Sequence, residues 1–114
     1  KGKVLKTFNS SKLFKGISIQ SDYGSPVFTA APGVVVYSGD GLRSYGKLII
    51  IRHDENYLSA YAHNKQIFVK ENETVIANQK ISESGHTETK NQSLYFEIRE
   101  GGKPVDPLKY LPKF

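Results

Sequence analysis

The chain has 114 residues, a length that suits one domain with a hydrophobic core of its own. It contains no cysteine, which excludes a disulfide framework, a thiol nucleophile and a cysteine-based zinc site. The net charge is +5, but the basic residues are scattered, so no nucleic-acid partner is expected and an acidic polymer or protein fits better.

The apolar stretches all fall short of the ~20 residues of a membrane span. No signal peptide is present, and the chain opens on Lys1-Gly2-Lys3. We therefore expect residues 1–114 to form a single domain, the C-terminal part of a longer protein.

Short strand patterns follow one another along the chain, separated by Gly, Pro and Asn turns. We expect strands at residues 3–8, 17–19, 27–31, 34–38, 47–53, 57–63, 67–69, 75–76, 80–82 and 92–99, and an extended tail or one helical turn at 105–112. Residues 47–53 are nearly all apolar or β-branched, which predicts a central buried strand. No segment shows helical periodicity, so the pattern predicts an all-β, antiparallel sandwich or barrel.

Strict alternation marks the stretch 92–99. Leu94, Phe96 and Ile98 fall on one face, which we expect to be the core face. Ser93, Tyr95, Glu97 and Arg99 fall on the other. In the stretch 57–63 the same reasoning places Leu58, Ala60 and Ala62 on one face, and Tyr57, Ser59, Tyr61 and His63 on the other.

Several short motifs occur in a fixed order: Lys15-Gly16-Ile17, Gly24-Ser25-Pro26-Val27, Tyr45-Gly46-Lys47-Leu48, Tyr61-Ala62-His63-Asn64, Gln79-Lys80-Ile81, Phe96-Glu97-Ile98-Arg99 and Val105-Asp106-Pro107-Leu108. Together they resemble the LytM or lysostaphin-type zinc endopeptidase domain of peptidoglycan enzymes. The resemblance implies a barrel-sandwich hybrid of the duplicated hybrid motif type. Asn72 and Asn78 stand where this family usually has Gly, and both turns are expected to survive because Asn tolerates positive φ.

Working members of the family bind zinc through the His and Asp of an H-x-x-x-D motif and the second His of an H-x-H motif. The resemblance places Phe14, Ser18 and Tyr95 at these three positions, and Ser93 at the first His of H-x-H. His63 alone is retained from the family's set, at the position of a His after Tyr-Ala that assists the zinc-bound water. Phe14 has no lone pair to offer, and neutral Ser and Tyr hydroxyls are poor zinc ligands. We therefore expect a catalytically inactive domain that holds no metal and needs no cofactor.

The family also contains non-catalytic members, the murein hydrolase (amidase) activators of the NlpD and EnvC type, and residues 48–53 and 57–64 are most similar to the NlpD type. The resemblance implies a partner of periplasmic N-acetylmuramoyl-L-alanine amidases. Such an activator captures the helix that blocks the amidase zinc site and so promotes septal peptidoglycan cleavage in cell separation. It also implies a periplasmic domain, peptidoglycan as a further contact, and a full-length protein anchored to the outer membrane as a lipoprotein.

We expect the partner to bind in the vestigial active-site groove. Its predicted lining is Phe14, Lys15, Ser18, Tyr45, His63, Ser93, Tyr95 and Arg99. Aromatic and Arg residues carry much of the binding energy at protein interfaces, and an amphipathic helix in a groove is a known recognition mode. Five of these residues also have a plainer interpretation: Tyr95 as a packing aromatic, Arg99 and Lys15 as solvated charges, Phe14 as filler of the vacated metal pocket, and His63 as support for the turn before Asn64.

Three rival functions stay open at this point. An active peptidase with unusual ligands would carry stoichiometric zinc. A passive peptidoglycan-binding module would bind sacculi without any effect on an amidase. A biotinyl or lipoyl carrier is suggested by Ala31-Pro32-Gly33 and the stretch 75–81, but no Lys stands at the tip of a tight hairpin with a carrier's flanking residues.

Overall fold

The computed structural model describes residues 4–6, 16–20, 22–86 and 93–109. These residues form ten strands and two single turns of 3-10 helix. They are β1 (Val4–Lys6), β2 (Ile17–Gln20), β3 (Pro26–Phe28), β4 (Gly33–Gly39), η1 (Arg43–Tyr45), β5 (Lys47–Arg52), β6 (Tyr57–Ile67), β7 (Thr74–Val75), β8 (Lys80–Ser84), β9 (Ser93–Glu100), β10 (Lys103–Val105) and η2 (Pro107–Lys109). Within this part of the chain no helix is long and apolar enough to cross a membrane.

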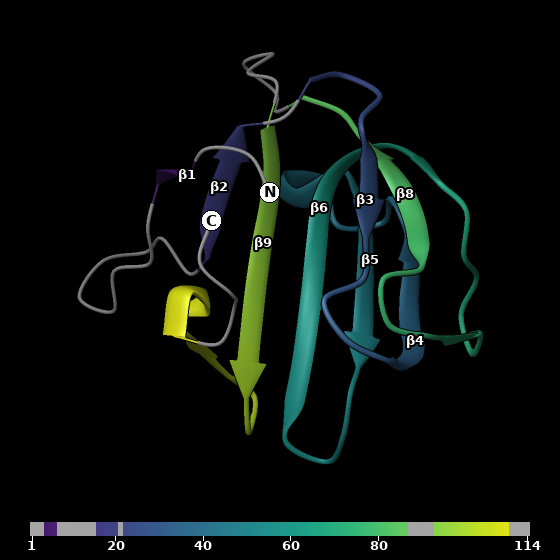
Figure 1. Ribbon diagram of the computed structural model, residues 1–114, viewed down its shortest axis with the longest axis vertical. Helices are drawn as coiled ribbons and strands as arrows, with labels where there is room; N and C mark the ends of the chain where they lie inside the picture. The colour runs from purple at the N-terminus through teal and green to yellow at the C-terminus, as the bar shows by residue number, and fades with distance from the viewer. Residues whose placement is uncertain (1–3, 7–15, 21, 87–92, 110–114) are drawn as a thin grey trace.

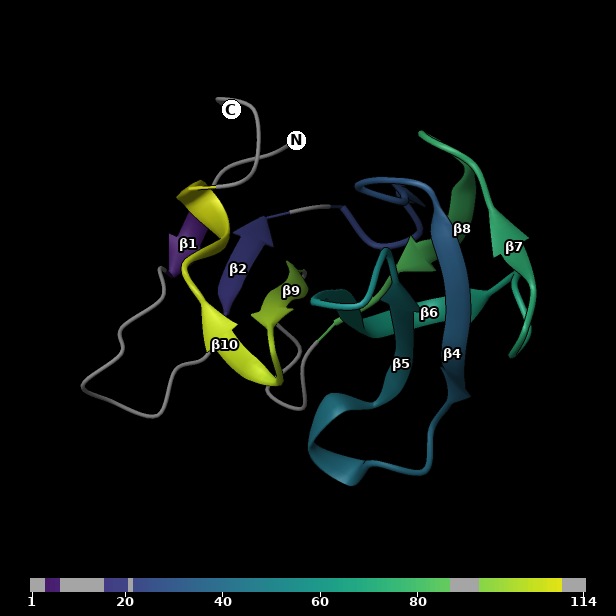
Figure 2. The same cartoon turned by 90° about the horizontal axis from the view of Figure 1, so that it is seen from below.

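The strands form a strongly bent antiparallel sheet that folds over itself. Its main path runs β1-β2-β9-β6-β5-β4-β7, and β10 adds to β9. Strand β8 pairs with the second half of β6 and also with β3. Strands β3 and β8 therefore lie in front of β5 and β4 (Figure 1). The view from below shows β8 and the main sheet as separate layers (Figure 2). This arrangement confirms the prediction of an all-β antiparallel sandwich.

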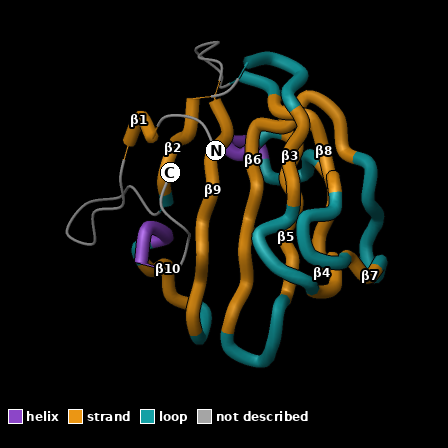
Figure 3. The backbone as a smooth tube through the Cα atoms, viewed as in Figure 1, coloured by secondary structure: helices purple, strands orange, loops and turns teal. Residues whose placement is uncertain are grey.

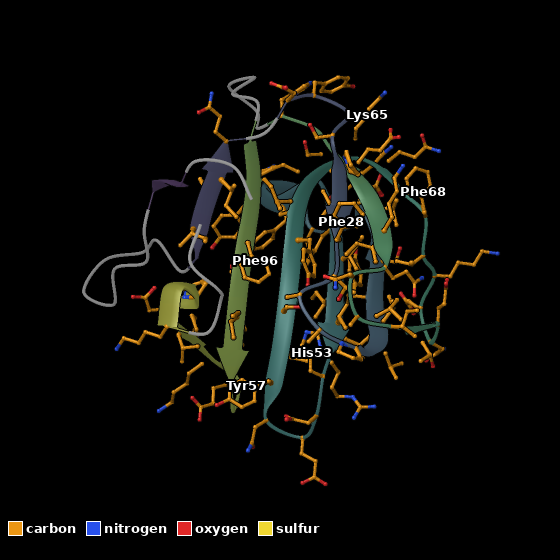
Figure 4. The ribbon with its side chains drawn as sticks, viewed as in Figure 1. Phe28, His53, Tyr57, Lys65, Phe68 and Phe96 are labelled. Atoms are coloured by element: carbon orange, nitrogen blue, oxygen red, sulfur yellow. The ribbon has the colours of Figure 1, made fainter. Side chains whose placement is uncertain are left out.

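The main core fills the space between the two layers. Its buried members are Ile17, Ile19, Val27, Val35, Ile49, Ile51, Tyr61, Val69, Val75, Ile81, Phe96 and Ile98. Phe96 projects into this core from β9, and its ring centroid lies 5.2 Å from that of Tyr61 (Figure 4). The prediction that 47–53 is a central buried strand is confirmed, because β5 lies between β4 and β6 with Ile49 and Ile51 fully buried.

Tyr61 also joins the two layers through its hydroxyl group. The backbone N–H of Ala30, at the end of β3, donates to the Tyr61 hydroxyl at 2.9 Å. Ser59 Oγ lies 2.9 Å from the same oxygen and 2.7 Å from Nε2 of His53, the residue after β5. His53 therefore belongs to the hydrogen-bond network around the Tyr61 hydroxyl.

The structure confirms the two Asn turns. Asn72 has φ 72° and Asn78 has φ 62°, the left-handed region in which Asn is the best substitute for Gly. The N–H of Asn72 donates to the carbonyl of Val35 at 2.7 Å, so this turn is tied to strand β4.

Three expected elements differ from the observed ones (Figure 3). No separate strand occurs at 67–69, because β6 continues to Ile67. Strand β3 ends at Phe28, where the expectation extended it to 31. The tail begins as strand β10 and ends as the 3-10 turn η2, so it combines the extended and helical alternatives.

Candidate functional site

Strand β9 presents its second set of side chains on the side of the main sheet opposite the core. Tyr95 packs there against a small separate cluster of Leu48, Ala60 and Ala62. The turn η1 lies on this same side, away from β8 (Figure 2). We use the name Tyr95 face for six residues on this side of the sheet: Ser18, Tyr45, His63, Tyr95, Glu97 and Arg99.

A buried carboxylate connects three of these side chains. Glu97 is 2% exposed, and its Oε2 accepts hydrogen bonds from the hydroxyls of Tyr95 at 2.7 Å and Tyr45 at 3.2 Å. Its Oε1 accepts from Nε of Arg99 at 2.9 Å. The rings of Tyr45 and Tyr95 are tilted, with centroids 6.0 Å apart. The sequence reasoning placed Glu97 on this face but gave it no role.

The electrostatics of the site follow from this carboxylate. Burial, together with the hydrogen bond and charge of Glu97, raises the pKa of the Tyr95 hydroxyl. Burial and the same carboxylate also raise the pKa of Tyr45. Burial disfavours the charged form of Arg99, but Glu97 outweighs it and the pKa of the guanidinium is raised. Both tyrosines are therefore neutral donors at physiological pH.

His63 reaches the face through a bulge in β6. Its φ is 65°, and the register between β5 and β6 shifts at this point. The first half of β6 pairs with β9 and the second half with β8, so His63 stands where the strand changes partner. The His63 ring lies edge-on to Tyr95 at 6.4 Å. Strict alternation put His63 on the same face as Tyr61, and this expectation was wrong because a bulge adds one residue.

Asn64, the last residue of the Tyr-Ala-His-Asn motif, holds the bulge. Its Nδ2 donates to the carbonyls of Lys47 and Tyr61, both at 2.8 Å, and its Oδ1 accepts from Ser82 Oγ at 2.6 Å. The amide thereby links β5, β6 and β8. An Asn directly after the retained His was the available sequence signal, and the sequence reasoning gave it no role.

Glycine makes room for these groups at two positions. A Cβ on Gly16 would meet the carbonyl oxygen of Phe96 and would lie 2.9 Å from Cγ of Glu97. Gly46 has φ 61° and lies against the His63 ring, which accounts for the Tyr45-Gly46 motif.

The remaining predicted site residues are placed in part. Ser18 is the direct register partner of Tyr95. Ser93 lies on β9 opposite Gln20, but its side chain is outside the described part of the structure. Phe14 and Lys15 lie outside the described residues altogether. The structure thus brings together Ser18, Tyr45, His63, Tyr95 and Arg99 of the eight predicted residues.

The described residues offer no alternative metal centre. No group of three or more His, Cys, Asp or Glu side chains among them is arranged to hold a metal ion. The other two His residues have different neighbours: His53 contacts Ser59 and the carbonyl of Pro32, and His86 stacks on Tyr23.

The sequence matches the profile of peptidase family M23 over residues 12–107. The chain belongs to this family. It is 50% identical over 113 residues to the murein hydrolase activator NlpD of Escherichia coli, covering 98% of this chain and 30% of that protein. It is also 50% identical over 113 residues to the lipoprotein NlpD/LppB homolog of Pseudomonas aeruginosa, of which it covers 38%. The chain thus spans about a third of the length of these relatives.

Solved M23 structures share the fold. A zinc-containing peptidase from Vibrio cholerae superposes with a TM-score of 0.88 at 27% identity, over 97% of this chain and 37% of that one. These findings confirm the resemblance to LytM-type M23 domains and the similarity to NlpD. This M23 chain therefore combines the fold of a zinc peptidase with a sequence that is 50% identical to proteins named as an activator or a lipoprotein.

Proposed function

We propose that the chain is a non-catalytic activator of an N-acetylmuramoyl-L-alanine amidase, which it binds through the Tyr95 face. By displacing an inhibitory helix from the amidase zinc site, it would promote septal peptidoglycan hydrolysis in cell separation. The proposal places the domain in the periplasm, within a protein anchored to the outer membrane. The relatives' names, a murein hydrolase activator and a lipoprotein, support the activator role and an envelope location.

The observation that carries the proposal is the bonding of Tyr95. Its hydroxyl donates at 2.7 Å to the buried carboxylate of Glu97. A raised pKa keeps this hydroxyl protonated, whereas zinc binds deprotonated or neutral basic ligands. The residue at the second His position of the family motif is therefore part of a hydrogen-bond network within the chain. This supports a binding role for the face and argues against a catalytic one.

The composition of the face suits a protein partner. Tyr45, Tyr95 and Arg99 are side chains of the types that dominate binding hot spots, and the two tyrosines pack on the apolar cluster of Leu48, Ala60 and Ala62. An amphipathic helix could lay its apolar side on the two tyrosine rings and its polar groups against Arg99.

The decisive experiment measures dye release from labelled sacculi. Three samples are compared: the domain alone, a candidate amidase alone, and both together. Release above the amidase baseline only in the mixture is expected. Release by the domain alone would contradict the assignment as a non-catalytic domain. If the domain sediments with sacculi but never stimulates any candidate amidase, the passive peptidoglycan-binding alternative is favoured.

Substitutions then test the face itself. Tyr95→Ala and Arg99→Ala are expected to reduce activation about tenfold or more, the effect of hot-spot residues. Phe28→Ala and Arg52→Ala are matched controls, because both side chains are exposed and Phe28 lies on the opposite layer. Arg99→Ala leaves a buried carboxylate without its cation, so denaturation midpoints must accompany each assay. Full activation by folded Tyr95→Ala and Arg99→Ala variants would rule out the Tyr95 face.

A further inference from the structure

Glu97 has the surroundings of a residue that organises others. Its carboxylate is almost fully buried, yet it receives three donors from two separate parts of the chain. Tyr95 and Arg99 come from its own strand, and Tyr45 comes from η1, more than fifty positions earlier. Burying a carboxylate is costly unless charge and hydrogen bonds compensate for lost water, and among the described residues this compensation comes from members of the face.

The backbone around Glu97 is shaped to admit the carboxylate. On one side Gly16 approaches so closely that any Cβ would lie 2.9 Å from Cγ of Glu97 and 3.0 Å from Cζ of Tyr95. On the other side the register partner in β6 is Ala60, a residue with a minimal side chain. Small residues on both neighbouring strands leave space for the Glu97 side chain beneath the tyrosine rings.

We propose that Glu97 is a positioning residue, which holds Tyr45, Tyr95 and Arg99 as one preassembled surface for the partner. The inference rests on the proposed function and deepens it. Preassembly matters because ordering each long side chain on binding costs conformational entropy. A surface whose two tyrosines and arginine are already fixed avoids most of that cost.

The hydrogen bonds also define the chemistry that this surface offers. Each tyrosine hydroxyl has a single proton, and both protons are directed to Glu97, so each hydroxyl oxygen can meet a further group only as an acceptor. Arg99 contacts Glu97 through Nε, and 32% of its side chain is exposed. Its terminal nitrogens are therefore suited to a carboxylate or carbonyl oxygen. The complementary partner segment carries donors opposite the tyrosines and an acceptor opposite Arg99.

Glu97→Gln is the sharpest test, because glutamine has the same shape and no charge. Nε of Arg99 cannot accept a hydrogen bond, so the amide oxygen must face Arg99 and the amide nitrogen must face the tyrosines. Both hydroxyls then have to turn their protons outward. The variant thus removes the charge that holds Arg99 and reverses the hydrogen bonds of both tyrosines, with almost no change in side-chain volume. Glu55→Gln, at an exposed position in the turn between β5 and β6, is the control for the same change in net charge.

The first measurement needs no partner. Tyrosine ionisation is followed by ultraviolet absorbance during an alkaline titration. Because Glu97 contributes to the raised pKa of Tyr45 and Tyr95, Glu97→Gln is expected to ionise more tyrosine at about pH 11 than the parent chain or Glu55→Gln. An unchanged titration curve would overturn the inference.

The second measurement is affinity for the amidase by calorimetry, with denaturation midpoints recorded alongside. Glu97→Gln is expected to raise Kd about tenfold, equivalent to about 1.4 kcal/mol, while Glu55→Gln leaves it unchanged. The double variant Tyr45→Phe/Tyr95→Phe removes both hydroxyls and keeps the Glu97–Arg99 pair. It is expected to weaken binding similarly, and it replaces Glu97→Gln in the test if that variant does not fold.

The outcomes separate the inference from the proposed function. Wild-type affinity in Glu97→Gln, or in the double Phe variant, together with weak binding by Tyr95→Ala, would overturn the role of Glu97 and leave the Tyr95 face as the binding surface. Wild-type affinity in all of these variants would overturn both proposals. Weakened binding and an altered titration in a variant that keeps its denaturation midpoint would establish the positioning role.

Discussion

Ser18 on β2 and Tyr95 on β9 are direct register partners in the antiparallel sheet. The resemblance to the zinc endopeptidases assigns these positions to the zinc-binding Asp and the second His of H-x-H. The sheet therefore still brings the two positions together, but it brings together two hydroxyls. Because Tyr95 is bonded to Glu97, this part of the vestigial site is a stable polar network.

The first prediction concerns zinc. The chain, purified without added metal, is expected to contain well below one equivalent of zinc by elemental analysis, because hydroxyls are poor zinc ligands and a single His cannot hold the ion. The triple variant Phe14→His/Ser18→Asp/Tyr95→His restores the family's ligand set and is expected to retain zinc near stoichiometry. Stoichiometric zinc in the unmodified chain would revive the active-peptidase alternative.

The second prediction concerns alkaline stability. The pKa of Tyr95 is raised above its ordinary value of 10.0, first by burial and then by Glu97. A raised folded-state pKa means that the stabilisation is fully present below the ordinary tyrosine pKa and is lost as pH rises beyond it. Urea denaturation from about pH 8 to about pH 11 should therefore show a steeper loss of stability for the parent chain than for Tyr95→Phe. Equal slopes would mean that the Tyr95 hydroxyl is not buried and hydrogen-bonded to Glu97 in solution.

The third prediction concerns Gly16. A Cβ at this position would meet the carbonyl oxygen of Phe96, a backbone atom that moves only if β2 and β9 separate. Gly16→Ala is expected to cost about 1–3 kcal/mol of unfolding free energy and to disturb the Glu97 network. Gly39→Ala is the matched control, since its Cβ would have an ordinary contact of 3.4 Å with the Tyr37 hydroxyl. Similar denaturation midpoints for the two variants would contradict the close approach at Gly16.

The sequence predicted the strands and the composition of the face better than it predicted the details of the site. Period-two alternation in β9 correctly separated Phe96 from Tyr95, because that strand has no bulge within 94–98. The burial of Glu97 could not be predicted from the sequence, because it depends on Gly16 and on Tyr45, which come from distant segments. The length of β6 was also missed. A residue with positive φ normally ends a strand, but the hydrogen bonds of Asn64 let β6 continue past His63.

The last prediction uses His63 to separate a structural role from a binding role. At φ 65° a His is strained, whereas Gly adopts this conformation freely, so His63→Gly is expected to keep the bulge and to change stability by less than about 1 kcal/mol. His63→Ala keeps the strain and loses the ring, and should be the less stable of the two variants. These stabilities are measured by urea denaturation.

The amidase assay then decides what the ring does. If the His63 ring, edge-on to Tyr95, is part of the binding surface, the stable Gly variant activates the amidase several-fold less than the parent chain. If His63 serves only to form the bulge, the Gly variant activates fully, because Asn64 still links β5, β6 and β8. Full activation would therefore show that the His63 ring is not part of the binding surface and that His63 only forms the bulge.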